Sequence, residues 1–501
     1  MTRMRIGIDY EGVSCVKITK GTLPPRTTLD SNRQAFLYNT KWEKNVRALA
    51  LERAPYTSGG GVEPAGSSIS SSNHYWYTVT GSVVTHVYKP SRYTSLDYLM
   101  PLVDVKPVSS STLRYLEAQF VQSSFGYQQR GQRWELIRPS VYKDYRDISV
   151  AYGNVLVPYC WLFTNDYASE FNGRRFYSVV WNLPGDETEL VDPPAVAPVP
   201  GQKTIQINAS HCRAAKPGYD VRTATPSQLA FDSSNRPVKI VRAADIAVPS
   251  GASEYDLGMT LPVNTVIDLH LYKGGTIYYP LNPADTSFGV QYWLEGTKIK
   301  FSNGSDACRA RFMVLAFDDT PPTAGSNKVF RQFVEGGQNV IQLLRPGSAD
   351  PVAFADVVVD SRWPALQLLA EDYIPVTANG HQTYSVPIDG AGMFLFVKFR
   401  TVHGGAGNPA VNGSYAKAVR QPQVAFYSAN GVSGFSVSGI TGDSAYCTLT
   451  DSQVVFHTHR GAPVRAYFND LQALDSNQVS YDYDGAPILG IRYYVFGLAQ
   501  P

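Results

Sequence analysis

One short pattern occurs three times in this 501-residue chain and constrains its fold more than any other feature. Each copy has an apolar triplet, then Asn or Asp, then Ser or Thr, and a second run with apolar residues at alternate positions follows. Asx and Ser/Thr side chains bond to nearby backbone and favour tight turns, and alternation is typical of a strand with one buried face. The pattern predicts three strand-turn-strand units. The copies are Phe36-Leu37-Tyr38-Asn39-Thr40, Leu229-Ala230-Phe231-Asp232-Ser233 and Val357-Val358-Val359-Asp360-Ser361.

The turn residues of the three copies are expected to be structural and not catalytic. Their side chains should accept backbone N–H bonds within the turns, because short polar side chains do this readily outside regular structure. The residues concerned are Asn39, Thr40, Asp232, Ser233, Asp360 and Ser361.

Two later elements follow each copy in the same order, which indicates related domains. An apolar strand with a basic end is expected at 83–89, 266–273 and 393–400, and a late aromatic strand at 157–163, 311–317 and 491–496. The turn positions 39, 232 and 360 are unevenly spaced, which excludes a solenoid of fixed period. Duplicated globular β-domains with different loop lengths fit this arrangement.

The composition indicates an all-β protein. Charged residues make up 17% of the chain, below the roughly 25% usual for globular domains, while Tyr is abundant at 32 residues. Gly and Pro interrupt the sequence throughout, and the best helical candidate is the short segment 111–121. We therefore predict tandem β-sandwich domains, jelly-roll-like in form, joined by Pro-rich linkers.

Two Pro-rich stretches divide the chain. Segment 185–201 is rich in Pro, Ala and Val, and segment 320–325 begins Thr-Pro-Pro, so both favour extended spacers. The predicted domains are 1–184, 202–319 and 326–501, with a long Ser/Gly surface loop at 57–73 in the first.

Several function classes are disfavoured by absent features. The N-terminus lacks the apolar run of a secretion signal, and no stretch approaches the ~18 apolar residues of a membrane span. The five cysteines are scattered singly, without disulfide or zinc spacing. A net charge of +2 argues against bulk nucleic-acid binding. We expect a protein made in a cytoplasm, with no cofactor and no metal. The cysteines are Cys15, Cys160, Cys212, Cys308 and Cys447.

The chain lacks the common catalytic signatures, among them the phosphate loop, His-Glu-x-x-His and Gly-x-Ser-x-Gly. His457 and His459 would share one face of a strand, but without an evident third ligand they are interpreted as ordinary strand residues. Carboxylates such as Asp268, Asp482 and Asp484 are candidates for an acid/base pair in glycan hydrolysis. That role depends on the distance between two carboxylates, which the sequence alone does not give. The protein is predicted not to be an enzyme.

Tyrosine clusters are the candidate interaction surfaces. Tyr combines a large contact area with one polar end, so it is favoured at interfaces and in recognition loops. Covering of β-cores is the competing interpretation. The candidate interface residues are Tyr75, Trp76, Tyr77, Tyr142, Tyr145 and Tyr152.

The second copy, with the residues that precede and follow it (218–240), resembles a module of virion structural proteins of tailed bacteriophages. The other two copies are similar but less complete, and the resemblance covers about a sixth of the chain. It implies a tail, baseplate or fibre component and transfers no catalytic residue. A phage particle assembles in the host cytoplasm, so a leaderless virion protein is expected.

Together these observations predict a non-enzymatic structural component of a tailed phage particle, in the tail tip, baseplate or fibre, that contributes to assembly and host attachment. The expected partners are other virion proteins, further copies in a trimer or hexamer, and a host receptor or glycan, with no nucleic acid and no membrane insertion. Two alternatives stay open: a capsid decoration or head-fibre protein, and a carbohydrate-binding or carbohydrate-degrading surface protein.

Overall fold

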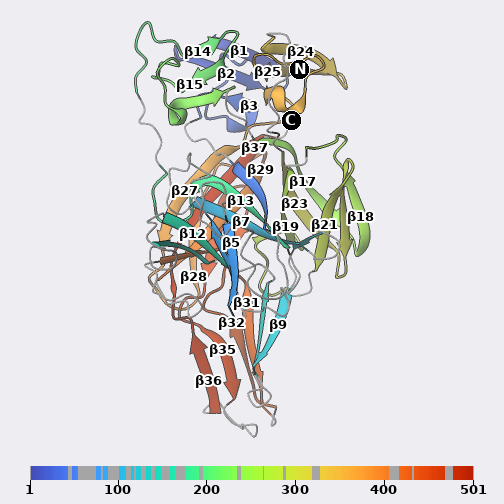
Figure 1. Ribbon diagram of the computed structural model, residues 1–501, viewed down its shortest axis with the longest axis vertical. Helices are drawn as coiled ribbons and strands as arrows, with labels where there is room; N and C mark the ends of the chain where they lie inside the picture. Colours follow the sequence, from blue (N-terminus) through green and yellow to red (C-terminus); the bar gives the residue numbers. More distant parts are fainter. Residues whose placement is uncertain are drawn as a thin grey trace.

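The computed structural model shows an elongated molecule with three parts (Figure 1). We call them the head, which lies at the end where the chain starts and finishes, the body, and the tip at the opposite end. The described residues are 2–42, 48–54, 75–80, 83–88, 101–108, 114–117, 120–125, 131–136, 142–147, 158–164, 175–190, 196–233, 238–262, 265–285, 289–316, 318, 328–404, 417–431, 434–468 and 478–499.

The head contains three small antiparallel sheets of the same design. Each has two strands, a short 3-10 turn and a third strand that carries the apolar triplet. In every sheet the middle residue of that triplet (Leu37, Ala230 or Val358) is skipped by the strand pairing, so the same β-bulge recurs. The elements are β1 (Arg3–Ile8), β2 (Ser14–Thr19), η1 (Arg33–Ala35) and β3 (Phe36–Asn39); β14 (Ile205–Ile207), β15 (Cys212–Ala215), η3 (Pro226–Gln228) and β16 (Leu229–Asp232); β24 (Phe330–Glu335), β25 (Gln338–Leu344), η4 (Phe354–Asp356) and β26 (Val357–Asp360).

The body repeats a second design three times. In each repeat the last strand pairs on both sides, with the strand that follows the head unit and with a later strand. The strand after the head unit always carries one unpaired residue, Leu49, Val241 or Leu369. The three groups are β4 (Ala48–Ala54), β13 (Arg175–Pro184) and β7 (Pro101–Val108); β17 (Lys239–Val248), β23 (Cys308–Ala316) and β19 (Thr265–Tyr272); β27 (Gln367–Pro375), β37 (Ile488–Ala499) and β29 (Met393–Gly404).

The first repeat runs from β1 to β13, the second from β14 to β23 and the third from β24 to β37. Their remaining strands are β5 (Tyr75–Thr80), β6 (Val83–Tyr88), β8 (Tyr115–Glu117), β9 (Phe120–Phe125), β10 (Gly131–Leu136), β11 (Tyr142–Asp147), β12 (Pro158–Thr164), β18 (Gly251–Asp256), β20 (Ile277–Tyr279), β21 (Val290–Glu295), β22 (Lys298–Asn303), β28 (Gln382–Pro387), β30 (Lys417–Arg420), β31 (Ala425–Asn430), β32 (Ser436–Ile440), β33 (Ala445–Leu449), β34 (Gln453–Thr458), β35 (Pro463–Phe468) and β36 (Val479–Tyr483).

Sheets cross the limits of the repeats. One sheet has the order β27-β37-β29-β30-β11-β12-β6-β5 and joins the third repeat to the first, and another, β18-β22-β21-β8-β7-β13-β4, joins the second to the first. The tip combines β9 and β10 of the first repeat with β31 and β32 of the third, and β35 and β36 lie beside them (Figure 1). The domain limits inferred from the Pro-rich segments stay a prediction. Strands of the predicted domains pair with strands of the neighbouring ones.

The all-β prediction is confirmed: the described residues form many antiparallel sheets, without an α-helix or a closed sheet among them. The helical candidate at 111–121 is wrong, because β8 and the first residues of β9 occupy its described part. The matching of later elements is wrong for the first repeat: β7 and β13, not the strands near 83–89 and 157–163, hold the positions of β19 and β23. In the first repeat two strands, β5 and β6, stand between β4 and β7, and β9 to β12 stand between β8 and β13, so the matching strands come later in the sequence than the spacing suggested.

The largest cores lie in the body. One packs β17, β19 and β23 against β21 and β22 of the same repeat, and a second packs β29 and β37 against β33 and β34. A third contains Trp181, Met313 and Phe396, one from each repeat, and so holds the three repeats together. Burial of such apolar surface is the main favourable term in folding.

Candidate functional site

The three head units share one structural feature, a hydroxyl group that bonds to the neighbouring strand. Thr40, Ser233 and Ser361 each donate their backbone N–H to a second-strand carbonyl and accept the backbone N–H of that same residue at the hydroxyl oxygen. The partners are Val16 (3.1 and 3.0 Å), Cys212 (2.9 and 2.9 Å) and Ile341 (2.9 and 3.0 Å). The hydroxyl thus extends the strand ladder by one bond after the third strand ends.

The Asx residue before each hydroxyl shapes the turn. Asn39 Oδ1 accepts the N–H of Lys41 at 3.0 Å, and Asp360 Oδ1 accepts the N–H of Arg362 at 2.8 Å. Asp360 is buried and also accepts Gln342 Nε2 at 2.6 Å and Arg362 at 2.7 Å. Asp232 ends β16 at the matching place. These contacts are what a turn-forming role requires.

The three head units contact one another. Tyr38 of the first repeat donates its hydroxyl to the carbonyl of Ala230 in the second at 3.4 Å, and its ring lies edge-on to Phe231. Arg345 of the third repeat donates to the carbonyl of Ser233 at 3.1 Å, and Asn339 donates to the carbonyl of Thr2 at 3.0 Å. Every repeat therefore touches the other two, around a shared apolar core.

Beneath the head, three strands that match by register bring six polar side chains into the interior. Asp104 on β7, Asp268 on β19 and Lys398 on β29 hold matching positions. Each pairs with a residue of the last strand of its own repeat, one position before the place where that strand faces the unpaired residue of its other neighbour. Two residues further along each strand stand Lys106, His270 and Arg400. We call these six buried residues the central charge cluster.

Contacts within the central charge cluster cross between repeats. Lys398 Nζ lies 2.6 Å from Asp104 Oδ2 and also contacts Asp268 Oδ2. Lys106 Nζ lies 3.3 Å from Asp268 Oδ1, and Arg400 pairs with Asp104 Oδ1. The His270 ring stacks on aromatic rings on both sides, with centroids 3.9 and 4.0 Å away. Each carboxylate is thus paired with cations from outside its own repeat.

The electrostatics of this cluster are set by burial and by its own charges. Burial alone would raise the pKa of Asp104, but the charges of Lys398 and Arg400 outweigh it and hold that pKa well below its ordinary value. Burial alone would lower the pKa of Lys398, but Asp104 and Asp268 hold it above its ordinary value. Both groups are therefore charged at neutral pH, and the cluster is a buried network of ion pairs.

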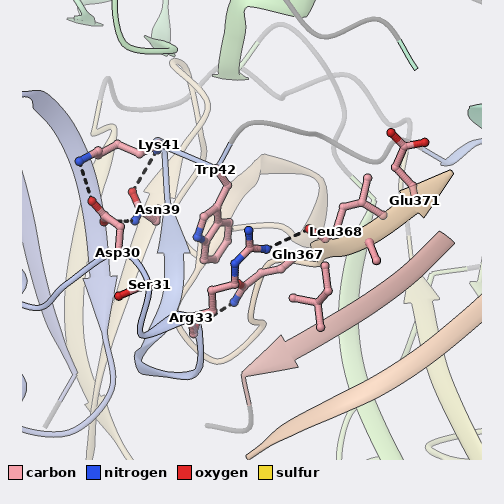
Figure 2. Close-up of a pocket in the computed structure, with 11 residues that line it drawn as sticks. Asp30, Ser31, Arg33, Asn39, Lys41, Trp42, Gln367, Leu368 and Glu371 are labelled. Carbon is pink, nitrogen blue, oxygen red and sulfur yellow. Dashed lines mark hydrogen bonds and ion pairs between the residues drawn. The ribbon is translucent and has the colours of Figure 1, made fainter. Parts of the chain in front are cut away.

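A cavity of about 530 Å³ lies between the head of the first repeat and β27 of the third (Figure 2). Arg33 donates to the carbonyl of Leu368 at 3.0 Å, and Gln367 Nε2 donates to the carbonyl of Arg33 at 3.1 Å, so the two sides are tied together. The lining residues are Asp30, Ser31, Arg33, Asn39, Lys41, Trp42, Gln367, Leu368, Leu369, Ala370 and Glu371.

Two buried polar atoms at this cavity have no hydrogen-bond partner among the described residues. They are the indole Nε1 of Trp42, a donor, and Oε1 of Gln367, an acceptor. A buried polar atom without a partner is costly, so a bound water or polar ligand would stabilise the site. The lining offers side chains of both charges and one indole ring, which suits the binding of a polar ligand.

Three carboxylates near this cavity are neutralised by a lysine. Asp9, Glu11 and Asp30 bring carboxylate oxygens within 4.8 Å of one another, a spacing that could hold a cation. Lys41 Nζ occupies that place, 2.9 Å from Asp9 and 2.6 Å from Asp30, and it also contacts Glu11. Burial raises the pKa of Asp9, but Lys17 and Lys41 outweigh it and lower that pKa to about 2. The cation of this site is the lysine itself.

The two histidines considered from the sequence belong to a larger stack. His381, just before β28, lies parallel to His459 with centroids 4.7 Å apart, and its Nε2 is 3.0 Å from His457 Nδ1. Tyr446 stacks on His457 from the next strand. Burial and the neighbouring His381 lower the pKa of His457 and of His459 to about 4. The third histidine was missed because it lies 76 residues from His457.

The candidate interface residues fall on strands of the first repeat. Tyr75, Trp76 and Tyr77 lie on β5, the edge strand of the largest sheet, and Tyr142 and Tyr145 lie on β11 in the interior of that sheet. Tyr152 lies outside the described residues. The interface role of these residues stays a prediction.

Sequence analysis missed a second group of tyrosines at the tip. Tyr481 and Tyr483 on β36 are exposed, the latter by 60%, and Tyr427 on β31 packs edge-on against Tyr481. Arg133 of the first repeat anchors this region through Asp443 at 2.6 Å. The alternation of Tyr with Asp over residues 481–484 is the signal that could have indicated a half-exposed strand.

The cysteines and the carboxylates considered from the sequence lie in different parts of the structure. Cys15, Cys212, Cys308 and Cys447 are buried and free, and the side chain of Cys160 lies outside the described set. Asp268 belongs to the central charge cluster, whereas Asp484 pairs with Arg420 at 2.6 Å. Among the described residues, no helix is long and apolar enough to cross a membrane.

Comparison with known protein families, characterised proteins and solved structures found no match.

Proposed function

We propose that the protein is a non-enzymatic structural component of a tailed phage particle, in the tail tip, baseplate or fibre, where it contributes to assembly and host attachment. One observation carries this proposal: the two ends of an elongated molecule both present exposed apolar or aromatic side chains, with an ion-locked body between them. Large exposed apolar groups in clusters are typical of interaction sites.

The body suits a mechanical role. Sheets shared between repeats and the buried central charge cluster tie the repeats to one another, which suits a component that holds its two ends at a set distance. The partners in this proposal are other virion proteins at one end and a host receptor or glycan at the other. A capsid decoration or head-fibre position would use the same surfaces.

Localisation tests the proposal. Antibodies raised against the purified protein should label the tail of intact particles in electron micrographs, and the protein should remain with particles through density-gradient purification. Labelling of the capsid would favour the decoration alternative. Recovery of the protein only from the soluble fraction of infected cells, with none on purified particles, would overturn the proposal.

A second candidate function, glycan binding, is favoured by the cavity beside Trp42. An indole ring with a buried unpartnered N–H, an unpartnered amide oxygen and side chains of both charges is suited to a polar ligand of sugar size. Binding to a glycan array should be lost in Trp42→Ala and kept in Trp293→Ala, a matched tryptophan outside the cavity. Equal binding by the two variants would exclude this cavity as the site.

A further inference from the structure

The first strand of every head unit is an edge strand. β1, β14 and β24 each pair with the second strand of their sheet on one side, and the described residues contribute no strand on the other. An edge strand presents unpaired N–H and C=O groups and is a template for pairing with another chain. The three edges hold matching positions in the three repeats, so whatever pairs with one edge finds the same arrangement at the others.

Exposed apolar side chains concentrate in the head. Of the thirteen large apolar side chains that are exposed in the described part of the chain, ten lie in head segments 2–42, 196–233 and 328–363. Five of them stand on the edge strands themselves: Ile6 and Ile8 on β1, Ile207 on β14, and Phe330 and Val334 on β24. Val334 is 72% exposed, and apolar side chains that gather on one part of a surface are typical of interaction sites.

The head is also the basic part of the molecule. The same three segments hold fifteen Lys and Arg against nine Asp and Glu, a net charge of +6, whereas the whole chain carries +2. An exposed cation stands at or just before the start of each edge strand: Arg3, Lys203 and Lys328. None of these three side chains forms an ion pair with a described residue. The complementary surface is therefore acidic.

We propose that the head docks by strand addition at β1, β14 and β24 onto an acidic protein partner that presents the same segment three times around a three-fold axis. A second copy of this chain does not fit, because two basic heads would face each other. A polypeptide is favoured over nucleic acid or an anionic membrane, because only a peptide backbone can pair with the exposed strand edges. The proposal rests on the proposed assembly function and names its partner.

The stoichiometry that follows differs from the trimer or hexamer expected from the sequence. The three units that meet the partner belong to one chain, so a single copy occupies each three-fold site. A three-fold partner offers three identical segments, and three matched edges on one rigid head engage them together. Linked binding events of this kind raise the overall affinity far above that of one edge.

A capped, fluorescently labelled heptapeptide of alternating valine and glutamate serves as the probe of the edges. Anisotropy titration of the full-length protein should give three equivalents of bound peptide per chain, with affinity falling as salt is added. The variants Ile6→Glu, Ile207→Glu and Val334→Glu should each reduce the capacity from three to two. Tyr483→Glu at the tip is the matched control and should keep three.

Four outcomes would overturn the proposal: a capacity of one or none, equal binding of the same peptide with lysine in place of glutamate, a capacity unchanged in all three edge variants, or binding to anionic vesicles or duplex DNA that the three edge variants abolish while the peptide does not bind. Circular dichroism and the melting temperature establish that each variant is folded. Particle labelling tests the proposed function separately, since a protein located on the tail could still dock by another surface.

Discussion

Lys398 is bound by carboxylates that stand 130 and 294 positions away in the sequence. Taking a charge out of water costs several kcal/mol, so a lysine that is 1% exposed is stable only while those carboxylates are present. Asp104 also accepts the indole N–H of Trp181 at 2.9 Å, which satisfies a further lone pair. One side chain thus couples the folding of three distant segments.

Replacing this lysine tests the coupling. Lys398→Met keeps much of the side-chain volume but leaves Asp104 and Asp268 facing fewer cations, and we expect a loss of about 3–5 kcal/mol in the free energy of unfolding. Urea denaturation monitored by tryptophan fluorescence measures it. Lys298→Met removes a lysine from an exposed ion pair with Glu254 and should change stability far less, because water screens that pair. Equal effects of the two substitutions would show that the buried cluster is not critical.

The histidine stack should make stability depend on pH. The folded pKa values of His457 and His459, about 4, lie below the ordinary 6.5, so between these pH values the unfolded chain binds more protons than the folded one. The melting temperature should therefore fall as pH is lowered from 6.5 to 4. Carboxylates with depressed pKa values, such as Asp104, lose their contribution only from about pH 4 downward.

The matched double variant isolates the stack. His457→Gln with His459→Gln removes both titrating rings, so the decline in melting temperature between pH 6.5 and 4 should become shallower than in the unaltered protein. A decline of the same slope in the double variant would assign the pH dependence to other groups.

At the residue scale, the sequence predicted the turn side chains and overlooked the ion cluster. Asn39, Thr40 and their counterparts act within a few residues or across one strand pair, so a local pattern reveals them. The cluster depends on which strands meet in space, and the alternation Asp-x-Lys, Asp-x-His and Lys-x-Arg within apolar strands was its one local sign. Charges at buried strand positions indicate partners, but the sequence does not say which.

At the scale of elements, one hydroxyl adds the last bond to the hydrogen-bond ladder of each head unit. Ser233 and Ser361 are buried, and each accepts a backbone N–H of the neighbouring strand that has no alternative partner at that place in the ladder. The bulge in the third strand places the hydroxyl there, since skipping one residue shifts the following side chain relative to its neighbours. The sequence pattern marks the residues of this element, whereas the bond to the neighbouring strand is seen only in the structure.

Removing the hydroxyl should be costly in a defined way. Ser361→Ala leaves the N–H of Ile341 buried without a partner, and we expect a loss of about 1–3 kcal/mol in the free energy of unfolding. Ser361→Thr retains the hydroxyl and should recover part of the loss. Ser227→Ala, in the exposed turn before β16, is the control and should be near neutral. Similar losses for Ser361→Ala and Ser227→Ala would contradict the structural role of the hydroxyl.

At the scale of the whole molecule, strands on the two sides of the Pro-rich segments share sheets. Composition favoured stiff spacers between separate domains, but the long-range pairing of β11 with β30, or of β21 with β8, joins the repeats on either side of them. Such pairing forms between strands hundreds of residues apart and has no local signature beyond ordinary alternation. The sequence therefore predicts the strands of this protein far better than their neighbours.

Shared sheets predict that the repeats fold together. Differential scanning calorimetry should show one transition, because unfolding of one repeat exposes strand edges and core residues of the other two. An isolated fragment of residues 202–319 should lack the dispersed spectrum of a folded protein in solution NMR. Three resolved transitions, or a fragment that folds alone, would instead support the tandem-domain arrangement predicted from the linkers.

The central charge cluster has a consequence for symmetry itself. A ring of three identical subunits can place on its axis only three like side chains, and three buried lysines or three buried aspartates would repel one another. Covalent linkage removes that restriction, because each repeat can carry its own residue at the shared position. Opposite charges can then neutralise one another where an assembly of identical copies would have to use apolar or uncharged groups. The three repeats are thereby chemically distinct, since the matched pairs are Asp104 with Lys106, Asp268 with His270 and Lys398 with Arg400.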